Sequence, residues 1–190
     1  MRCLICESIS LKHICKCCEN EYLSPSLYKR KILGKIPVYS FYKYHDIEPL
    51  LLSKHTDLGY YIYTQLAQNS FASFAQTFEY ESKVCSLGID DHIKHGYSHT
   101  AILNKALQST YIKPLFSKIR AKSKVSYSGK KYQFRLLNPR NFEVESFHDE
   151  DVILVDDIIT TGLTLTQAIQ TLEANGKNVL FCLTLADARK

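Results

Sequence analysis

The C-terminal stretch of the chain restricts the possible fold more than any other part of the sequence. Residues 152–155 form an unbroken apolar run, Val-Ile-Leu-Val, of the kind that parallel sheets bury on both faces. After a polar turn, apolar residues recur between positions 165 and 172 at the spacing of one helix face, and Gly176 suits the position where a helix ends. Residues 179–185 form a second apolar run. This order predicts two parallel strands joined by a right-handed helical crossover, and therefore an α/β fold.

The polar turn after the first apolar run carries groups that suit a phosphorylated sugar. Asp156 and Asp157 directly follow the run, and two carboxylates at the end of a strand can hold a vicinal diol with help from a hydrated divalent cation. The Thr-Thr-Gly turn at residues 160–162 supplies hydroxyls and backbone N–H groups at a helix start, which suit a phosphate monoester. Gly162 lets the backbone approach the anion without a Cβ. The alternative interpretation is an ordinary strand–turn–helix unit with surface carboxylates.

Two other kinds of phosphate site are disfavoured, because the turn lacks a Walker A lysine and the sequence has no G-x-G-x-x-G. Residues 152–165 instead resemble the loop that binds 5-phosphoribosyl 1-pyrophosphate (PRPP) in type I phosphoribosyltransferases. The resemblance implies that the acidic pair is catalytic and holds the ribose hydroxyls with Mg²⁺, and that the Thr/Gly turn holds the 5′-phosphate. The residues predicted to bind PRPP are Asp156, Asp157, Ile158, Ile159, Thr160, Thr161, Gly162 and Thr164, together with the backbone of Leu87 and Gly88.

The cysteines are concentrated at the N-terminus. Five of the seven lie within the first eighteen residues and no export signal precedes them, which favours thiolates in a reducing compartment over disulfides. Cys3-x-x-Cys6 and Cys15-x-x-Cys18 each place two thiolates on one tight turn, as tetrahedral Zn²⁺ requires. Cys17 is an alternative ligand at a less usual spacing. The competing interpretation is a set of reduced structural thiols, but a segment this polar offers them no core.

Composition divides the chain into a small module and one larger domain. Residues 1–24 are expected to form a separate four-cysteine zinc module, and residues 25–190 an α/β domain like that of type I phosphoribosyltransferases, with a parallel sheet flanked by helices. Pro25 starts a predicted linker that contains the basic run at residues 29–31. Beyond the linker, the patterns predict strands at residues 36–44, 84–88 and 112–116 and helices at residues 47–54, 58–66 and 98–108.

The middle of the chain is basic and aromatic, although the formal net charge is only +5. Between His92 and Phe142 there are eleven Lys and Arg residues and no Asp or Glu. Interleaved tyrosines suit single-stranded nucleic acid, whose phosphates pair with cations and whose bases stack on rings. The alternative is a solvated lysine surface over core tyrosines. His92, His95 and His99 lack metal-ligand spacing and are predicted to make loop or anion contacts. The residues predicted to bind DNA are Lys94, Lys122, Lys124, Tyr127, Lys130, Lys131, Tyr132 and Arg135.

The cysteine pairs and the acidic turn together resemble the ComF (ComFC) family of competence proteins. Weaker likeness lies at residues 44–50, 95–99, 126–135 and 138–142. The chain departs from the family at residues 84–92, where Asp90 and Asp91 would repel pyrophosphate unless a cation lay between them. Backbone N–H groups at positions 87 and 88, and the charges of Lys94, His95, Lys130 and Lys131, could offset that repulsion.

The resemblance implies a protein of natural transformation that handles incoming single-stranded DNA in the cytosol and binds PRPP and Mg²⁺, with PRPP as ligand or substrate. It also implies contacts with other DNA-uptake and recombination proteins, and a peripheral association with the inner membrane. Two alternatives stay open: a metabolic phosphoribosyltransferase that joins PRPP to a base, and a regulator that senses PRPP without turnover. No apolar run approaches eighteen residues, so no segment is expected to span a membrane.

Overall fold

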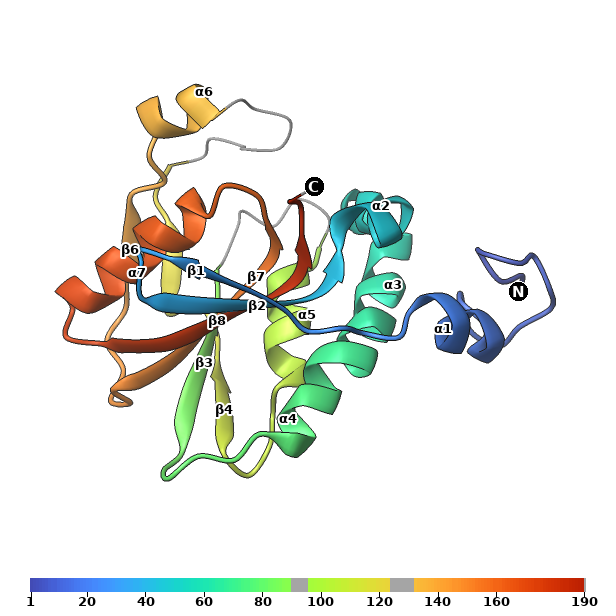
Figure 1. Cartoon of the computed structure of the whole chain (residues 1–190), viewed down its shortest axis with the longest axis horizontal. Helices are drawn as coiled ribbons and strands as arrows, with labels where there is room; N and C mark the ends of the chain where they lie inside the picture. The colour runs from blue at the N-terminus through green and yellow to red at the C-terminus, as the bar shows by residue number, and fades with distance from the viewer. Residues whose placement is uncertain (90–95, 124–131, 190) are drawn as a thin grey trace.

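A six-stranded sheet forms the centre of the molecule (Figure 1). The structure, a computed structural model, describes residues 1–89, 96–123 and 132–189. In spatial order the strands are β1 (Tyr28–Ile32), β2 (Ile36–Lys43), β8 (Asn178–Asp187), β7 (Asp151–Ile159), β3 (Val84–Gly88) and β4 (Ile112–Leu115). Among these, β1 pairs antiparallel with β2 and all other pairs are parallel. A small antiparallel pair, β5 (Ile119–Ala121) and β6 (Phe142–Val144), lies outside this sheet. The predicted α/β fold with a mostly parallel sheet is confirmed.

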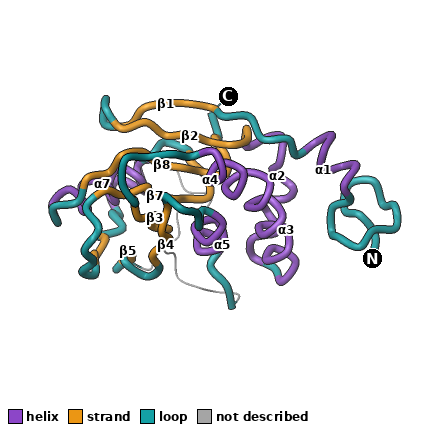
Figure 2. Tube along the Cα trace, turned by 90° about the horizontal axis from the view of Figure 1, so that it is seen from below, coloured by secondary structure: helices purple, strands orange, loops and turns teal. Residues whose placement is uncertain are grey.

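Helices cover both faces of the sheet (Figure 2). One face carries α2 (Tyr44–Leu52), α3 (Asp57–Ala67), α4 (Ser73–Thr77) and α5 (His99–Ala106), with a 3-10 turn at Ser53–His55 and a π turn at Gln68–Ala72. The other face carries α7 (Leu163–Ala174). Two further helices lie away from the sheet, α1 (Lys16–Tyr22) near the N-terminus and α6 (Tyr132–Leu137) before β6.

The apolar run in β7 explains why this sheet needs cover on both sides. Ile153 and Val155 point into the apolar cluster formed with α3 and α5. Val152 and Leu154 point into the cluster formed with α7. Because successive side chains of a strand alternate between faces, a strand buried on both faces is apolar at every position.

Two segments differ from the sequence-based prediction. The strand predicted to end at Val155 continues to Ile159, because β8 pairs alongside it as far as the Ile159–Asp187 partners. The acidic pair therefore lies within a strand and not in a turn. Residues 28–32, predicted as part of a linker, form β1, which reaches β2 through a tight turn with positive φ at Leu33 and Gly34.

The other predicted elements are found within a few residues of their expected bounds. These are β2, α2, α3, β3, α5, β4, α7 and β8. Gly176 has φ 73° just beyond α7, as predicted for a residue that ends a helix. Ser98 caps α5, since its Oγ accepts a hydrogen bond from the Ala101 N–H at 3.1 Å.

The N-terminal module packs onto the domain, which the sequence did not predict. Ile14 and Leu23 are buried in the same apolar cluster as α3, so the expectation that this segment has no core was wrong. Gln65 on α3 donates a hydrogen bond to the Ile14 carbonyl at 2.9 Å, and the Tyr42 hydroxyl donates to the Leu23 carbonyl at 3.0 Å. The domain boundary after residue 24 stays a prediction. In the described part of the chain, no helix has the length and apolar character needed to cross a bilayer.

Candidate functional site

The strand order creates a topological switch point between β3 and β7, the place where open parallel sheets have a crevice. From β3 the chain passes through α5 to β4 on one side, whereas from β7 it passes through α7 to β8 on the other side. Helices of opposite faces therefore leave from two neighbouring strands, which is the switch point where open parallel sheets bind ligands. Gly88 of β3 is the register partner of Val155, so the next residues of β7, Asp156 and Asp157, lie at the carboxyl end of this crevice.

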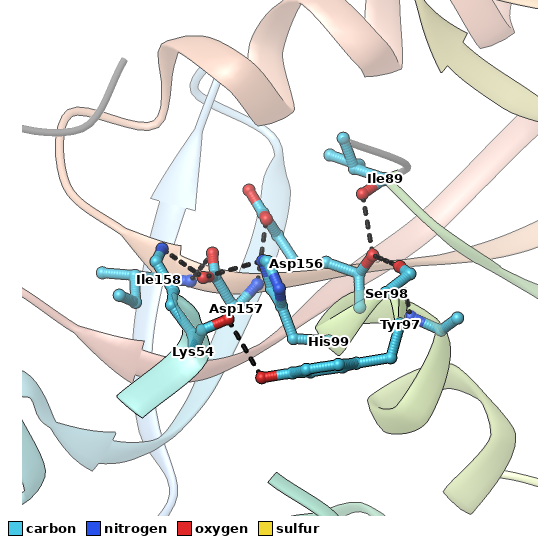
Figure 3. A network of polar contacts seen from close by, with 10 residues as sticks. Lys54, Ile89, Tyr97, Ser98, His99, Asp156, Asp157 and Ile158 are labelled. Atoms are coloured by element: carbon cyan, nitrogen blue, oxygen red, sulfur yellow. Dashed lines mark hydrogen bonds and ion pairs between the residues drawn. The ribbon is translucent and has the colours of Figure 1, made fainter. Parts of the chain in front are cut away.

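The acidic pair is almost completely buried. Asp156 is 9% exposed and Asp157 is 8% exposed. Backbone groups hold both carboxylates, because the Asp157 N–H donates to Asp156 Oδ1 at 2.9 Å and the Ile158 N–H donates to Asp157 Oδ1 at 2.7 Å (Figure 3). Two carboxyl groups so close together cannot both ionise without added positive charge.

Basic side chains from two other elements lie against Asp157. Lys54 Nζ, from the 3-10 turn after α2, donates to Asp157 Oδ2 at 2.9 Å, and His99 Nε2, at the start of α5, lies 3.5 Å from the same oxygen (Figure 3). The Tyr97 hydroxyl donates to the Lys54 carbonyl at 3.0 Å and so supports that turn. Burial by itself would raise the pKa of the Asp157 carboxyl, but the neighbouring Lys54 and His99 lower that pKa below its ordinary value.

Asp156 has the opposite electrostatic environment. Burial and then the charge of Asp157 raise the pKa of the Asp156 carboxyl above its ordinary value, although Arg140 opposes the shift. Arg140, 8% exposed, comes from the segment between α6 and β6. The pair therefore combines a strongly ionised acceptor with a carboxyl that holds its proton to higher pH. Paired acids with such divided pKa values are typical of functional sites.

The Thr-Thr-Gly turn starts α7 as predicted. Gly162 is the N-cap with φ 81°, a conformation that favours glycine. A Cβ at this position would lie 3.0 Å from Ile32 Cγ2 and 3.3 Å from Arg30 Nη2, both on β1. The sequence predicts that Gly162 lets a ligand approach the backbone closely. In the structure, β1 also approaches the backbone closely at this position. The N–H groups of the first turn of α7 point out of the helix start, as in sites that hold phosphate.

The remaining predicted PRPP residues lie on both sides of the crevice. Thr160 and Thr161 are exposed, Ile159 is buried at the end of β7, and Ile158 and Thr164 are half-buried. Leu87 and Gly88 are the last two residues of β3 and both are buried, beside Leu154 and Val155 of β7. Their role in binding pyrophosphate stays a prediction.

Five of the eight residues predicted to bind DNA belong to segments that the structure does not describe. Lys94, Lys124, Tyr127, Lys130 and Lys131 lie outside the described residues, as do Asp90, Asp91, His92 and His95. For Tyr132 and Arg135 the structure places only the backbone, in α6. Lys122 follows β5, and its Nζ pairs with Glu143 Oε1 at 3.3 Å.

The four cysteines chosen from the sequence come together. Their sulfur atoms all lie within 4.8 Å of one another, so Cys3, Cys6, Cys15 and Cys18 could hold a metal ion. Four sulfurs at the Zn–S distance of about 2.3 Å would be about 3.8 Å apart, and Cys6 Sγ and Cys15 Sγ are 3.6 Å apart. Backbone N–H groups of Ile5, Cys15 and Cys18 donate to the sulfurs of Cys3 and Cys15. Cys17, weighed as an alternative, is exposed and outside this group.

Sequence reasoning missed the partners of the acidic pair. Lys54 and Arg140 are single basic residues without a motif, and their approach to the pair depends on how α2 and the segment after α6 pack. His99 was predicted to make a loop or anion contact. It does contact an anion, but from the first turn of α5, and that anion is the Asp157 carboxylate of the protein itself.

The C-terminal part of the sequence matches a known domain family. Residues 106–190 match the family model described as phosphoribosyl transferase domain. That segment contains β4, β7, α7 and β8, with the acidic pair and the Thr-Thr-Gly turn. A search of curated proteins gave no match.

Several solved structures are similar to the chain at low sequence identity. A hypoxanthine phosphoribosyltransferase from Staphylococcus aureus has 18% identity and a TM-score of 0.41, over 66% of this chain and 62% of that chain. This chain thus spans less than two thirds of that protein. An adenine phosphoribosyltransferase from Rhodothermus marinus has 18% identity and a TM-score of 0.43, over 85% and 82%. An orotate phosphoribosyltransferase from Aeropyrum pernix has 18% identity and a TM-score of 0.39, over 89% and 78%.

The family match and the sheet topology agree on the kind of fold. The match covers residues 106–190, and the sheet order places a topological switch point at the carboxyl ends of β3 and β7. The chain is a mixed α/β protein with a mostly parallel sheet, and its residues 106–190 are similar to the phosphoribosyl transferase domain.

Proposed function

We propose that the chain binds PRPP with Mg²⁺ at the carboxyl end of β7. The observation that carries this proposal is the placement of two groups on one short segment. A buried acidic pair and the glycine-capped start of α7 are separated by only four residues, at the switch point of the sheet. This spacing suits a ligand with a vicinal diol near one end and a phosphate monoester at the other.

The two carboxyl groups would have different roles in binding the ribose. Lys54 and His99 keep Asp157 ionised, so that it accepts protons from ribose hydroxyls. Asp156, whose pKa is raised, can donate or accept depending on pH. The carboxylate oxygens of the pair are of the type that Mg²⁺ prefers, and Mg²⁺ would neutralise charge on the pyrophosphate group of PRPP. The Thr160 and Thr161 hydroxyls and the N–H groups that start α7 would hold the 5′-phosphate.

Calorimetric titration with PRPP and MgCl₂ tests this site. We expect the Asp156→Asn, Asp157→Asn double variant to lose PRPP binding while its circular dichroism spectrum stays that of the wild type. Asp46→Asn, which changes a half-exposed aspartate on α2, is the matched control and should bind as the wild type does. Equal PRPP affinity in the double variant and the wild type would refute the site.

A second function, the handling of single-stranded DNA, is favoured by a row of aromatic rings. Tyr97, Tyr60, Tyr61 and His13 follow one another with centroid distances of 5.9, 5.4 and 4.8 Å. Tyr60 is 47% and Tyr61 is 55% exposed, and with Tyr97 they line an open hollow of about 300 Å³. The exposed rings of Tyr60 and Tyr61 can each stack on a base, at about 1–3 kcal/mol per base.

Together with the resemblance to the ComF family, this row supports the fuller proposal of a competence protein. In that role the chain would receive incoming single-stranded DNA in the cytosol and would carry Zn²⁺ on its four cysteines. Lys122 and the other basic residues predicted to bind DNA would contact phosphates. We expect a labelled oligonucleotide to bind with a log affinity that falls linearly with log salt concentration. An absence of binding at low salt would remove this function.

The metabolic alternative differs in one measurable product. A phosphoribosyltransferase that joins PRPP to a base releases pyrophosphate, whereas a DNA-handling protein that only binds PRPP does not. Incubation with PRPP, Mg²⁺ and each common purine and pyrimidine base, followed by a coupled pyrophosphate assay, separates the two. Release that depends on one base and is lost in Asp157→Asn would favour the metabolic enzyme.

A further inference from the structure

An arginine side chain of the edge strand reaches the turn that starts α7. The Arg30 side chain is only 9% exposed, and its Nη2 donates to the Thr160 carbonyl at 2.8 Å. Its Nη1 lies 3.4 Å from Asp187 Oδ1 at the end of β8. The same Nη2 lies 3.3 Å from the point where a Cβ on Gly162 would be. One guanidinium thus joins β1, β8 and the Thr-Thr-Gly turn.

The contact fixes the direction of a peptide group in the turn. In a trans peptide the C=O and N–H point to opposite sides of the unit. Since the Thr160 carbonyl points to Arg30, the N–H of Thr161 points away from β1. That direction would leave the N–H available to a ligand, while the carbonyl, which would repel a phosphate, stays bonded to Arg30.

The positive charge of Arg30 is only partly neutralised by its partner. Asp187 also receives Arg189, from Nε at 2.8 Å, from Nη2 at 2.7 Å and from the backbone N–H at 3.0 Å. These distances are shorter than the 3.4 Å from Arg30. Two guanidinium groups share one carboxylate, and Arg30 Nε is buried with no hydrogen-bond partner among the described residues. The local excess of positive charge lies directly behind the turn.

We propose that Arg30 is a positioning residue for the 5′-phosphate. This proposal rests on the proposed PRPP site. Arg30 holds the Thr160 carbonyl away from the ligand, sets the backbone N–H groups of the turn toward it, and adds positive charge behind them. Buried charge near a ligand is screened less by solvent than surface charge. The edge strand, which the sequence suggested was a linker, thereby becomes part of the phosphate site without touching the phosphate.

The test compares two ligands that share no phosphate subsite. Ribose 5-phosphate probes the turn, and Mg-pyrophosphate probes the other end of the PRPP site. We expect Arg30→Met to weaken ribose 5-phosphate binding about tenfold or more, because the turn loses both the hydrogen bond that holds the Thr160 carbonyl and the positive charge beside its N–H groups. Its affinity for Mg-pyrophosphate should not change. Arg30→Lys, which keeps the charge and one donor, should recover most of the loss. Lys31→Met, on the next and exposed residue of β1, is the control.

Three results would overturn the inference. They are unchanged ribose 5-phosphate affinity in Arg30→Met, equal losses for both ligands, and no difference between Arg30→Lys and Arg30→Met. If Arg30→Met does not fold, as thermal unfolding will show, Arg30→Gln replaces it and must bind ribose 5-phosphate more weakly than Arg30→Lys. A wild-type protein that binds neither ligand would refute the PRPP site itself, whereas a wild type that binds both isolates the role of Arg30.

Discussion

At the scale of single residues, the two neighbouring aspartates differ in how their burial affects the stability of the folded state. Asp157 has Lys54 and His99 against its carboxylate, whereas Asp156 is buried beside a second negative charge. A buried carboxyl that lacks compensation destabilises the folded state whenever it is ionised. A carboxyl with close basic partners stabilises the folded state, and loss of that carboxyl removes the acceptor of the largely buried Lys54 ammonium group. The same Asp→Asn change should therefore have opposite effects at adjacent positions.

We expect Asp156→Asn to stabilise the protein by about 1–2 kcal/mol at pH 8. The folded-state pKa of Asp156 is raised from 3.8 to about 8, so stability is lost as pH rises through this window. The gain from the substitution should therefore shrink as pH falls toward 4. Asp157→Asn should destabilise by about 3 kcal/mol at neutral pH. Urea unfolding of both variants between pH 4 and 8 measures these differences, and a shared sign at pH 8 would contradict them.

At the scale of elements, the N-terminal module contributes to the core of the domain. Ile14 and Leu23 pack into the cluster that contains α3, and Gln65 donates to the Ile14 carbonyl. Ile14 directly precedes Cys15, and Leu23 directly follows α1, which contains Cys18. A metal that closes the cysteine turns would therefore stabilise α3 as well as the module itself.

Metal removal should lower the melting temperature of the whole chain and not of the module alone. We expect one equivalent of Zn²⁺ by elemental analysis, and a single unfolding transition that shifts down by several degrees when a chelator is added. Cys6→Ser should lose the metal, whereas Cys17→Ser should keep it, although both cysteines are exposed. Retention of Zn²⁺ in Cys6→Ser, or an unfolding temperature of the domain that does not change when the chelator is added, would argue against this coupling.

The sequence predicted those elements whose pattern is local. The apolar runs of β7 and β8 and the apolar face of α7 each lie within one segment, so their periodicity revealed them. The cysteine pairs came together because each C-x-x-C already fixes two sulfurs on one turn. β1 was missed because its basic run contains too few apolar residues to show the alternating pattern of a strand. It was also missed because its pairing depends on β2. The partners of the acidic pair were missed because tertiary packing alone brings Lys54, His99 and Arg140 to β7.

At the scale of the whole molecule, a chain of contacts links the aromatic row to the acidic pair. The hydroxyl of Tyr97, whose ring contacts Tyr60, donates to the Lys54 carbonyl, and Lys54 Nζ donates to Asp157. Lys54 thus lies between the proposed base-stacking row and the proposed ribose site. A ligand that shifts Lys54 from one end would alter the energy of binding at the other end, and such coupling is reciprocal.

We expect saturating PRPP with Mg²⁺ to change the affinity for single-stranded DNA at least about threefold, and DNA to change PRPP affinity by the same factor. Tyr97→Phe removes the hydrogen bond to Lys54 but keeps the ring, so it should retain DNA binding and reduce the coupling. Tyr22→Phe, on an exposed tyrosine outside the row, is the control. Fluorescence anisotropy with each ligand in the presence of the other measures both factors. Equal affinities with and without the second ligand would show that the two sites are independent, and full exclusion in both directions would show that they overlap.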